Sequence, residues 1–139
     1  MSRRIEEYLE TIYGIVKQKG RARTKDIAGA MNVNPSTVTE MIQKLEEKGY
    51  VEYEKYGGVA LTKQGREIVK NLEEKHATLK NFFMLLGVDE EIADSDACKI
   101  EHVASNETIE ILTKFVEFVE KYSKPRWLKK FRKYCNEHG

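Results

Sequence analysis

The sequence lacks the features that stabilise small secreted proteins or anchor a chain in a membrane. Only two of its 139 residues are cysteines, Cys98 and Cys135, which is too few for a disulfide framework. No apolar run approaches the roughly 20 residues that a transmembrane helix needs. No signal peptide is recognisable. We therefore expect a cytoplasmic protein with no membrane partner, in which Cys98 is reduced and able to bind metal.

The chain also has little net charge and little proline. The formal net charge is +1, so the overall composition does not indicate a nucleic-acid partner. Basic residues gather locally instead, with six Lys and Arg against one Glu in residues 124–139, although such a run alone usually forms a solvated surface. Only two prolines are present, and with 40% hydrophobic and 34% charged residues this favours a mainly helical globular fold.

Three helices are predicted in the first 50 residues. Apolar residues at spacings of three and four predict an amphipathic helix over residues 4–18. A short helix over residues 24–31, capped by Thr24, and a tight turn follow. The third helix has Asn34 as N-cap, Pro35 at its first position and Gly49 after its end. This order is typical of the helix-turn-helix motif, whose last helix enters the major groove of DNA.

A β-hairpin is predicted directly after the third helix. The β-prone runs over residues 50–56 and 59–61 flank Gly57-Gly58, and glycine suits the positive φ angles of tight hairpins. Three helices and a hairpin make a winged helix-turn-helix, with the hairpin as the wing; packing on the helices is an equal alternative role for Tyr53. DNA contacts are expected from Thr24, Lys25, Pro35, Ser36, Thr37, Thr39, Glu40, Gln43, Lys55 and Tyr56.

The second half is predicted to be helical throughout. A long helix runs from residue 62 to 86, a second carries Ile92, Ala93, Ala97, Ile100 and Val103 inward, and a third runs from 105 or 106 to 122. Their apolar surface exceeds what such a segment can bury alone, which predicts a homodimer. Residues 123–125 break the pattern before a short amphipathic tail helix. The predicted fold is thus mainly α, with a winged helix-turn-helix over residues 1–62 and a helical metal-binding and dimerisation domain over 63–139.

Metal-ligating residue types recur at helical spacing in the second half. Cys98, Glu101 and His102 lie at i, i+3 and i+4, so one helical face would present a thiolate, a carboxylate and an imidazole. A first-row divalent ion takes about four to six donors, so other elements must supply the rest. The candidates are Glu7, Glu10 and His76. Taken alone, such a pattern more often consists of a buried cysteine with surface Glu and His residues that bind no metal.

With these elements in order, the chain resembles the diphtheria toxin repressor family of metal-dependent transcription regulators, in its short two-domain form. The likeness rests on residues 7–13 (EYLETIY), 35–39 (PSTVT), His76 and 96–105 (DACKIEHVAS). The resemblance implies a dimeric repressor that binds a palindromic operator when loaded with iron(II) or manganese(II) and controls uptake of that metal.

The same resemblance implies which residues bind the metal. It assigns Glu7, Cys98, Glu101 and His102 to the primary pocket, and Glu10 and His76 to a neighbouring or shared site. Iron-responsive members have Met and Cys at the positions of Glu7 and Cys98, whereas manganese-responsive members have carboxylates at both. The thiolate favours iron(II), cobalt(II), nickel(II) or zinc(II), and the carboxylates favour manganese(II). Iron(II) is slightly favoured.

Two positions depart from the iron-responsive pattern. Lys80 stands where those members carry a carboxylate of an ancillary metal site, and Asp94 stands where they carry a histidine. The ancillary site is therefore not expected in its usual form.

Two functions of other classes stay open. A metal or thiol enzyme would use Cys98 and His102 as nucleophile and base, but the sequence shows no glycine-rich phosphate loop and no third orienting residue. A winged-helix regulator with a structural zinc, or with Cys98 as an oxidation sensor, would keep the DNA-binding half. Reversible metal dependence of DNA binding separates both from the metal-responsive regulator.

Overall fold

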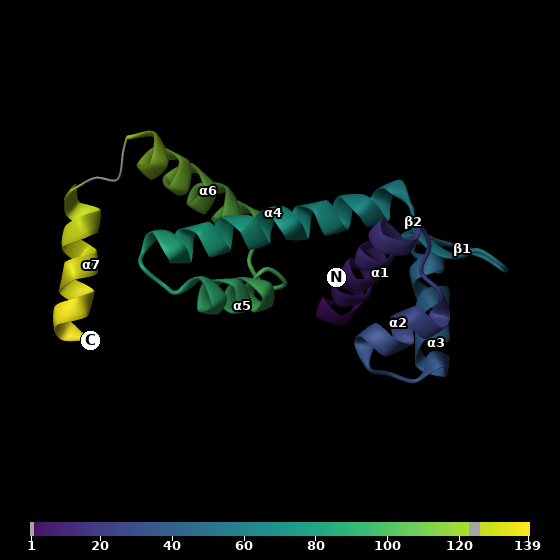
Figure 1. Cartoon of the computed structure of the whole chain (residues 1–139). Coiled ribbons are helices and arrows are strands. Elements are labelled where there is room, and N and C mark those ends of the chain that lie inside the picture. The colour runs from purple at the N-terminus through teal and green to yellow at the C-terminus, as the bar shows by residue number, and fades with distance from the viewer. Residues whose placement is uncertain (1, 123–125) are drawn as a thin grey trace. The chain divides into compact units, whose positions relative to one another are not determined.

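The computed structural model describes residues 2–122 and 126–139, which form helices and one two-stranded antiparallel sheet (Figure 1). The chain divides into two compact units, Met1–Asn71 and Leu72–Gly139. Among the described residues, no helix combines the length and apolarity needed to span a membrane. The elements are α1 (Arg3–Lys19), α2 (Thr24–Met31), α3 (Pro35–Glu47), β1 (Val51–Glu54), β2 (Gly58–Leu61), α4 (Lys63–Leu85), α5 (Glu90–Ile100), α6 (Asn106–Lys121) and α7 (Arg126–His138).

Helix α1 provides the centre of the first unit. Its side chains at three- and four-residue spacing, Tyr8, Leu9 and Ile12, are fully buried in one cluster with Val38 and Leu45 of α3. Burial of an aliphatic side chain such as Leu9 or Ile12 stabilises the fold by about 1.5–3 kcal/mol. Because α1 and α3 share this core, the orientation of α3 follows that of α1.

The helix-turn-helix forms largely as predicted. Asn34 is the N-cap of α3 and Pro35 its first residue, and the turn before it contains Asn32 at a φ of 56°. Thr24 was predicted to cap α2, and this is wrong, because Thr24 is already helical. The N-cap is Arg23, whose backbone N–H donates to Oδ2 of Asp26 at 3.3 Å. In a capping box, a carboxylate in the first turn accepts a hydrogen bond from the N-cap N–H, and Asp26 has this role here.

The wing is anchored to the chain that precedes α2. Strands β1 and β2 pair antiparallel from Val51 opposite Leu61 to Glu54 opposite Gly58. Ala22 then pairs with Val59 on the other side of β2, through hydrogen bonds of 3.0 and 2.7 Å. Gly58 has a φ of 78°, and a Cβ there would collide with the Ala22 carbonyl. This glycine therefore allows the close approach that makes β2 the middle of three extended segments.

The second unit is built from helices packed around α4. One buried cluster joins Leu79 of α4, Ala97 of α5 and Ile109 of α6. A second cluster joins the end of α4 to α6 and α7 and buries Leu128 of α7 almost completely. The Arg132 guanidinium of α7 donates to the Leu85 carbonyl at 3.1 Å, where α4 ends and its last carbonyls lack helical partners. The predicted tail helix thus forms and docks.

Two residues predicted to point inward from α5 do not. Ile92 is 56% exposed and Val103 is 77% exposed. The buried face of α5 consists of Ala93 and Ala97, and Ile92 lies about 100° away from it around the helix. Val103 lies beyond Ile100, where α5 ends. The predicted break at 123–125 lies outside the described residues.

Substitution of Gly65, in the first turn of α4, tests how tightly the first unit is packed. A Cβ at this position would collide with the Tyr50 carbonyl. We expect Gly65→Ala to lower the free energy of unfolding by about 1–3 kcal/mol, the range typical of overpacking. Urea denaturation followed by circular dichroism measures the change.

Gly14→Ala is the matched control, because outside the neighbouring backbone of α1 no atom lies within 4 Å of a Cβ added there. Alanine in a helix is more stable than glycine by about 0.5–1 kcal/mol. Equal urea midpoints for the two variants would contradict the prediction.

Candidate metal centre

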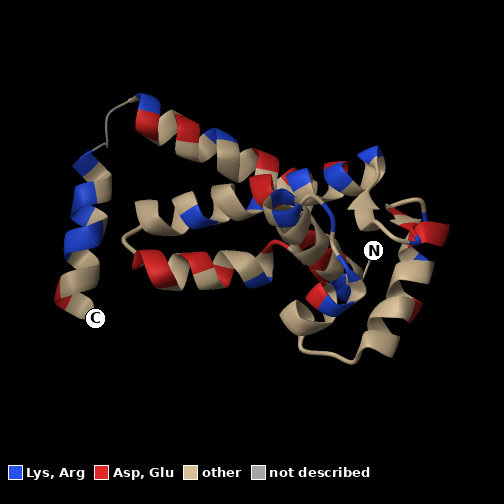
Figure 2. Ribbon diagram, turned by 45° about the vertical axis from the view of Figure 1, so that its right-hand side comes forward, with Lys and Arg blue, Asp and Glu red and all other residues tan. Residues whose placement is uncertain are grey.

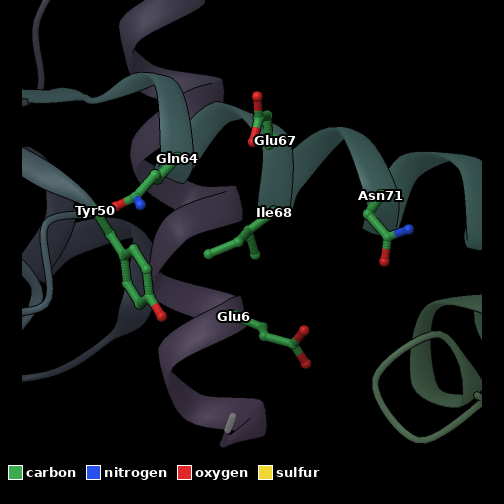
Figure 3. A pocket seen from close by; sticks show the side chains of 6 residues that line it. All are labelled: Glu6, Tyr50, Gln64, Glu67, Ile68 and Asn71. Atoms are coloured by element: carbon green, nitrogen blue, oxygen red, sulfur yellow. The ribbon is translucent and has the colours of Figure 1, made fainter.

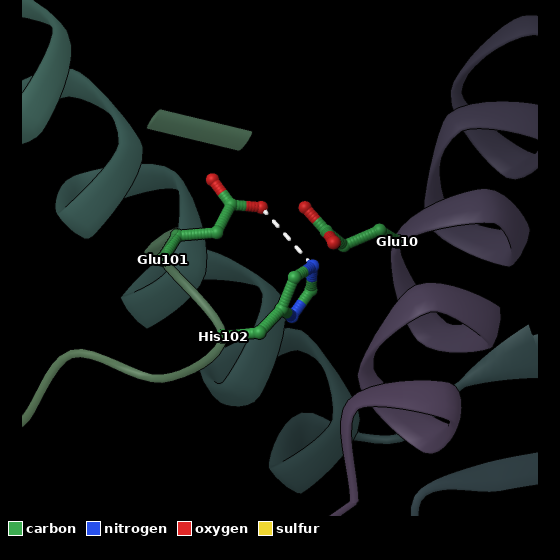
Figure 4. Close-up of side chains that lie close together, drawn as sticks. All are labelled: Glu10, Glu101 and His102. Atoms are coloured by element: carbon green, nitrogen blue, oxygen red, sulfur yellow. Dashed lines mark ion pairs between the residues drawn. The ribbon is translucent and has the colours of Figure 1, made fainter. Parts of the chain in front are cut away.

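The candidate site is centred on a buried carboxylate. Among the described residues, Glu101 is the only acidic or basic one that is buried, with 2% of its surface exposed. Its Oε2 lies 2.9 Å from Nδ1 of His76, and its Oε1 lies 3.6 Å from Nε2 of His102 (Figure 4). A carboxylate withdrawn from water requires hydrogen-bonded or charged partners, and two imidazoles provide them here.

A tight turn places Glu101 and His102. Helix α5 ends at Ile100, and the N–H groups of Val103 and Ala104 both bond to the Ile100 carbonyl at 2.9 Å. Lys75 of α4 secures this turn by donating to the Ala104 carbonyl at 2.8 Å. The prediction that Cys98, Glu101 and His102 all lie on one helix is therefore wrong for His102, because the chain must turn here to enter α6. Glu101 is the C-cap of α5, and its N–H still donates to the Ala97 carbonyl at 2.9 Å.

His76 links the buried carboxylate to the surface. It lies on α4, and its Nε2 is 2.8 Å from Oδ1 of Asp94 on α5. Lys80 lies 3.5 Å from the same oxygen and 3.4 Å from Oε1 of Glu90. The hydrogen bond from His76, aided by the positive charge of Lys80, holds the pKa of Asp94 below its usual value. Local sequence patterns did not reveal the His76–Asp94 contact, which spans 18 residues.

The other predicted donors lie in different surroundings. Cys98 is exposed on α5. Glu7 and Glu10 lie on α1 in the first unit, and both are partly buried (Glu10 is drawn in Figure 4). Glu7 forms ion pairs with Arg3 at 2.9 Å and Arg4 at 3.4 Å. In the second unit the structure thus brings together His76, Glu101 and His102.

The donor chemistry of this cluster fits a divalent ion. Carboxylate oxygen and imidazole nitrogen are ligands for manganese, iron and zinc alike. Helix α5 adds negative potential, since it carries four acidic residues and one lysine, and Figure 2 shows these acidic positions in red. A surface of one charge sign raises the local concentration of the opposite ion.

The predicted DNA-binding residues are accessible in the first unit. All are exposed except Thr24, which is half-buried. Tyr56, at the tip of the wing, is 82% exposed. The Thr39 hydroxyl donates to the Pro35 carbonyl within α3 at 3.1 Å, so its methyl group and remaining lone pairs are what it offers outward.

Two arginines that hold the wing were missed in the sequence. Arg21 pairs with Glu54 at the end of β1 at 2.9 Å, and Arg23 donates to the Tyr56 carbonyl at 3.3 Å. They flank Ala22, whose backbone is hydrogen-bonded to Val59 of β2. Three successive residues therefore contact the hairpin. Their partners lie 33 residues away, beyond the range of any local pattern.

A hollow lies in the first unit. It has a volume of about 410 Å³ and is lined by Glu6, Tyr50, Gln64, Glu67, Ile68 and Asn71 (Figure 3). The enzyme alternative uses Cys98 and His102, and neither residue lines this hollow.

Comparison with known families decides the class. Residues 1–59 match the model of the iron dependent repressor N-terminal DNA binding domain, and residues 62–127 match that of the iron dependent repressor metal binding and dimerisation domain. The chain belongs to the iron dependent repressor family. It is a metal-responsive, DNA-binding transcription regulator with a winged helix-turn-helix, as predicted. Family membership supports a divalent metal cofactor, a DNA partner and a homodimer.

Relatives of this family resemble the chain over most of its length. The HTH-type transcriptional regulator MntR of Bacillus subtilis (strain 168) is 40% identical over 136 residues, which is 97% of this chain and 96% of the relative. The uncharacterized HTH-type transcriptional regulator MJ0568 of Methanocaldococcus jannaschii is 45% identical over 119 residues, which is 84% of this chain and 95% of the relative.

Solved structures show the same fold. The hypothetical protein SSo2273 from Sulfolobus solfataricus superposes with a TM-score of 0.70 at 27% identity, over 90% of this chain and 92% of that one. The manganese regulator SloR superposes with a TM-score of 0.69 at 31% identity, over 85% of this chain and 55% of that one. The chain therefore spans about half the length of this longer regulator.

The arginines that grip the wing can be tested directly. Arg21→Ala removes the ion pair to Glu54, and exposed pairs contribute up to about 1 kcal/mol, so we expect the hairpin amides to exchange about two- to five-fold faster. Hydrogen exchange of β1 and β2 measures this. Arg3→Ala, which removes an ion pair of the same length on α1, should leave the hairpin unchanged. Equal hairpin exchange in both variants would show that Arg21 does not hold the wing.

Proposed function

We propose that the chain is a homodimeric repressor of metal-uptake genes in the cytoplasm, which binds a palindromic operator when loaded with iron(II) or manganese(II). One observation carries the proposal: Glu101 is a buried carboxylate between two imidazoles, inside the segment that matches a metal binding and dimerisation domain. A divalent cation compensates the burial of such a carboxylate well, because it adds positive charge and directional bonds.

The ligand set of the proposal draws on both halves of the sequence. It comprises Glu7, Glu10, His76, Cys98, Glu101 and His102. When bound, the ion supplies charge and directional bonds that link donors of α1 with donors of the second half. Helix α1 shares its core with α3, so a restraint on α1 orients the recognition helix. In a dimer, two recognition helices must lie about 34 Å apart, or a multiple of this, to enter one face of the operator.

The proposed donors favour different metals. The Cys98 thiolate favours iron(II), with cobalt(II), nickel(II) or zinc(II) as substitutes, whereas Glu7 and Glu10 favour manganese(II). The related SloR is a manganese regulator, which supports the second choice. We keep iron(II) as slightly favoured, because thiolates are seldom ligands of manganese.

The operator contacts of the proposal lie on α2, α3 and the wing. Ser36 and Thr39 contact base edges or a thymine methyl. Phosphate contacts, or support for them, come from Thr37, Gln43, Thr24 and Lys25. Lys55 and Tyr56 of the wing lie along the DNA backbone. Pro35 starts the recognition helix. Glu40 projects from the same exposed side and either accepts from a cytosine N4 or weakens non-specific binding by repulsion.

Glu101→Gln tests the function. The amide keeps the shape of the side chain but removes the negative charge, so we expect metal-dependent operator affinity to fall by about 100-fold or more. Anisotropy of a labelled operator measures the affinity, and light scattering confirms that the dimer remains.

Glu110→Gln is the matched control, since Glu110 lies exposed on α6 in an ion pair with Lys114. Metal activation should persist in this variant. Full activation of Glu101→Gln would refute the assignment of Glu101 to the metal centre.

A further inference from the structure

Lys80 lies between two carboxylates of a neighbouring helix. It follows His76 by four residues on α4, so the two side chains share one face. Its Nζ is 3.4 Å from Oε1 of Glu90 and 3.5 Å from Oδ1 of Asp94, which are likewise four residues apart on α5. One lysine thus joins α4 to two successive turns of α5.

The Asp94 oxygen beside Lys80 also contacts His76. Oδ1 of Asp94 lies 2.8 Å from Nε2 of His76, while Nδ1 of the same ring lies 2.9 Å from the buried Glu101. The side chains therefore form a line from the surface to the interior: Lys80, Asp94, His76, Glu101. All four belong to the second unit.

A carboxylate beside a histidine is a common arrangement around metal sites in proteins. A histidine that ligates a metal usually donates its other ring N–H to a carboxylate, which fixes the orientation of the ring and its tautomer. Asp94 meets Nε2 in this way, which leaves Nδ1 on the side of Glu101. The side chain of Asp94 is 54% exposed, so water competes for it. A second contact that anchors the same oxygen opposes this competition.

We propose that Lys80 and Asp94 are positioning residues of the metal centre: Lys80 holds Asp94 on Nε2 of His76, and this directs Nδ1 of His76 toward the divalent cation at Glu101. The inference rests on the proposed function and deepens it, since neither residue would touch the ion. Exposed ion pairs contribute little to stability, so the effect falls on metal affinity and on the His76 ring rather than on folding.

The test uses the full-length protein without DNA and manganese(II) as the probe. Isothermal titration calorimetry measures manganese(II) affinity, and the ¹⁵N shifts of the His76 ring in the metal-free protein report its hydrogen bonds. Asp94→Asn should weaken manganese(II) binding about 10- to 100-fold, and Lys80→Met by about three- to ten-fold, each with altered His76 shifts. Lys80→Arg, which keeps the charge, should restore both properties.

Lys114→Met is the matched control, because it removes the lysine of an exposed ion pair on α6 and should change neither property. Urea midpoints equal to that of the wild type show that the variants are folded. If wild type binds manganese(II) and the Lys80→Met and Asp94→Asn variants match it in affinity and His76 shifts, this inference alone is overturned. Failure of Lys80→Arg to restore the affinity overturns it as well. If wild type binds neither manganese(II) nor iron(II), the proposed function fails with it.

Discussion

The contact between the buried Glu101 carboxylate and His76 is the constraint around which the second unit is organised. A carboxylate removed from water is stable only with partners held in place, so α4 and the end of α5 must meet at a fixed separation. Ala97 of α5 packs there in one buried cluster with Leu79 of α4 and Ile109 of α6. The turn after Ile100, secured by Lys75, then aims Glu101 inward.

In the first unit, α1, α3 and the wing share one core. Helix α1 contributes Tyr8, Leu9 and Ile12 to the core and carries the proposed donors Glu7 and Glu10 beside this buried stripe. Because α3 packs against the same stripe, the orientation of α3 is coupled to that of α1. The wing is attached to the same unit through Ala22 and its two flanking arginines.

Much of this structure could be predicted from local sequence patterns. Helix starts at Pro35 and Ser105, the hairpin at Gly57-Gly58 and the end of α4 before Gly87 follow from capping and turn chemistry, which acts within a few residues. The tail helix followed from its apolar spacing.

The remaining features depend on contacts between distant residues. The end of α5 at Ile100 reflects the turn into α6, and helical spacing alone suggested that the helix continues through His102. The partners of His76, Lys80, Arg21 and Arg23 lie on other elements, so periodicity along one element cannot identify them. The exposure of Ile92 follows from which face of α5 meets α4. The family resemblance drew attention to Lys80 and Asp94, but only the structure shows that they contact each other.

The central claim is that a divalent metal ion enables this protein to bind its operator. The most direct measurement is the fluorescence anisotropy of an operator duplex with the metal-stripped protein, titrated anaerobically with iron(II) and manganese(II) in parallel at fixed salt. We predict tight binding only after metal is added, and the ion that acts at the lower free concentration is the better fit to Cys98 and Glu7. Equal binding of a verified operator with and without metal would contradict the claim and reduce the Glu101 cluster to a structural element.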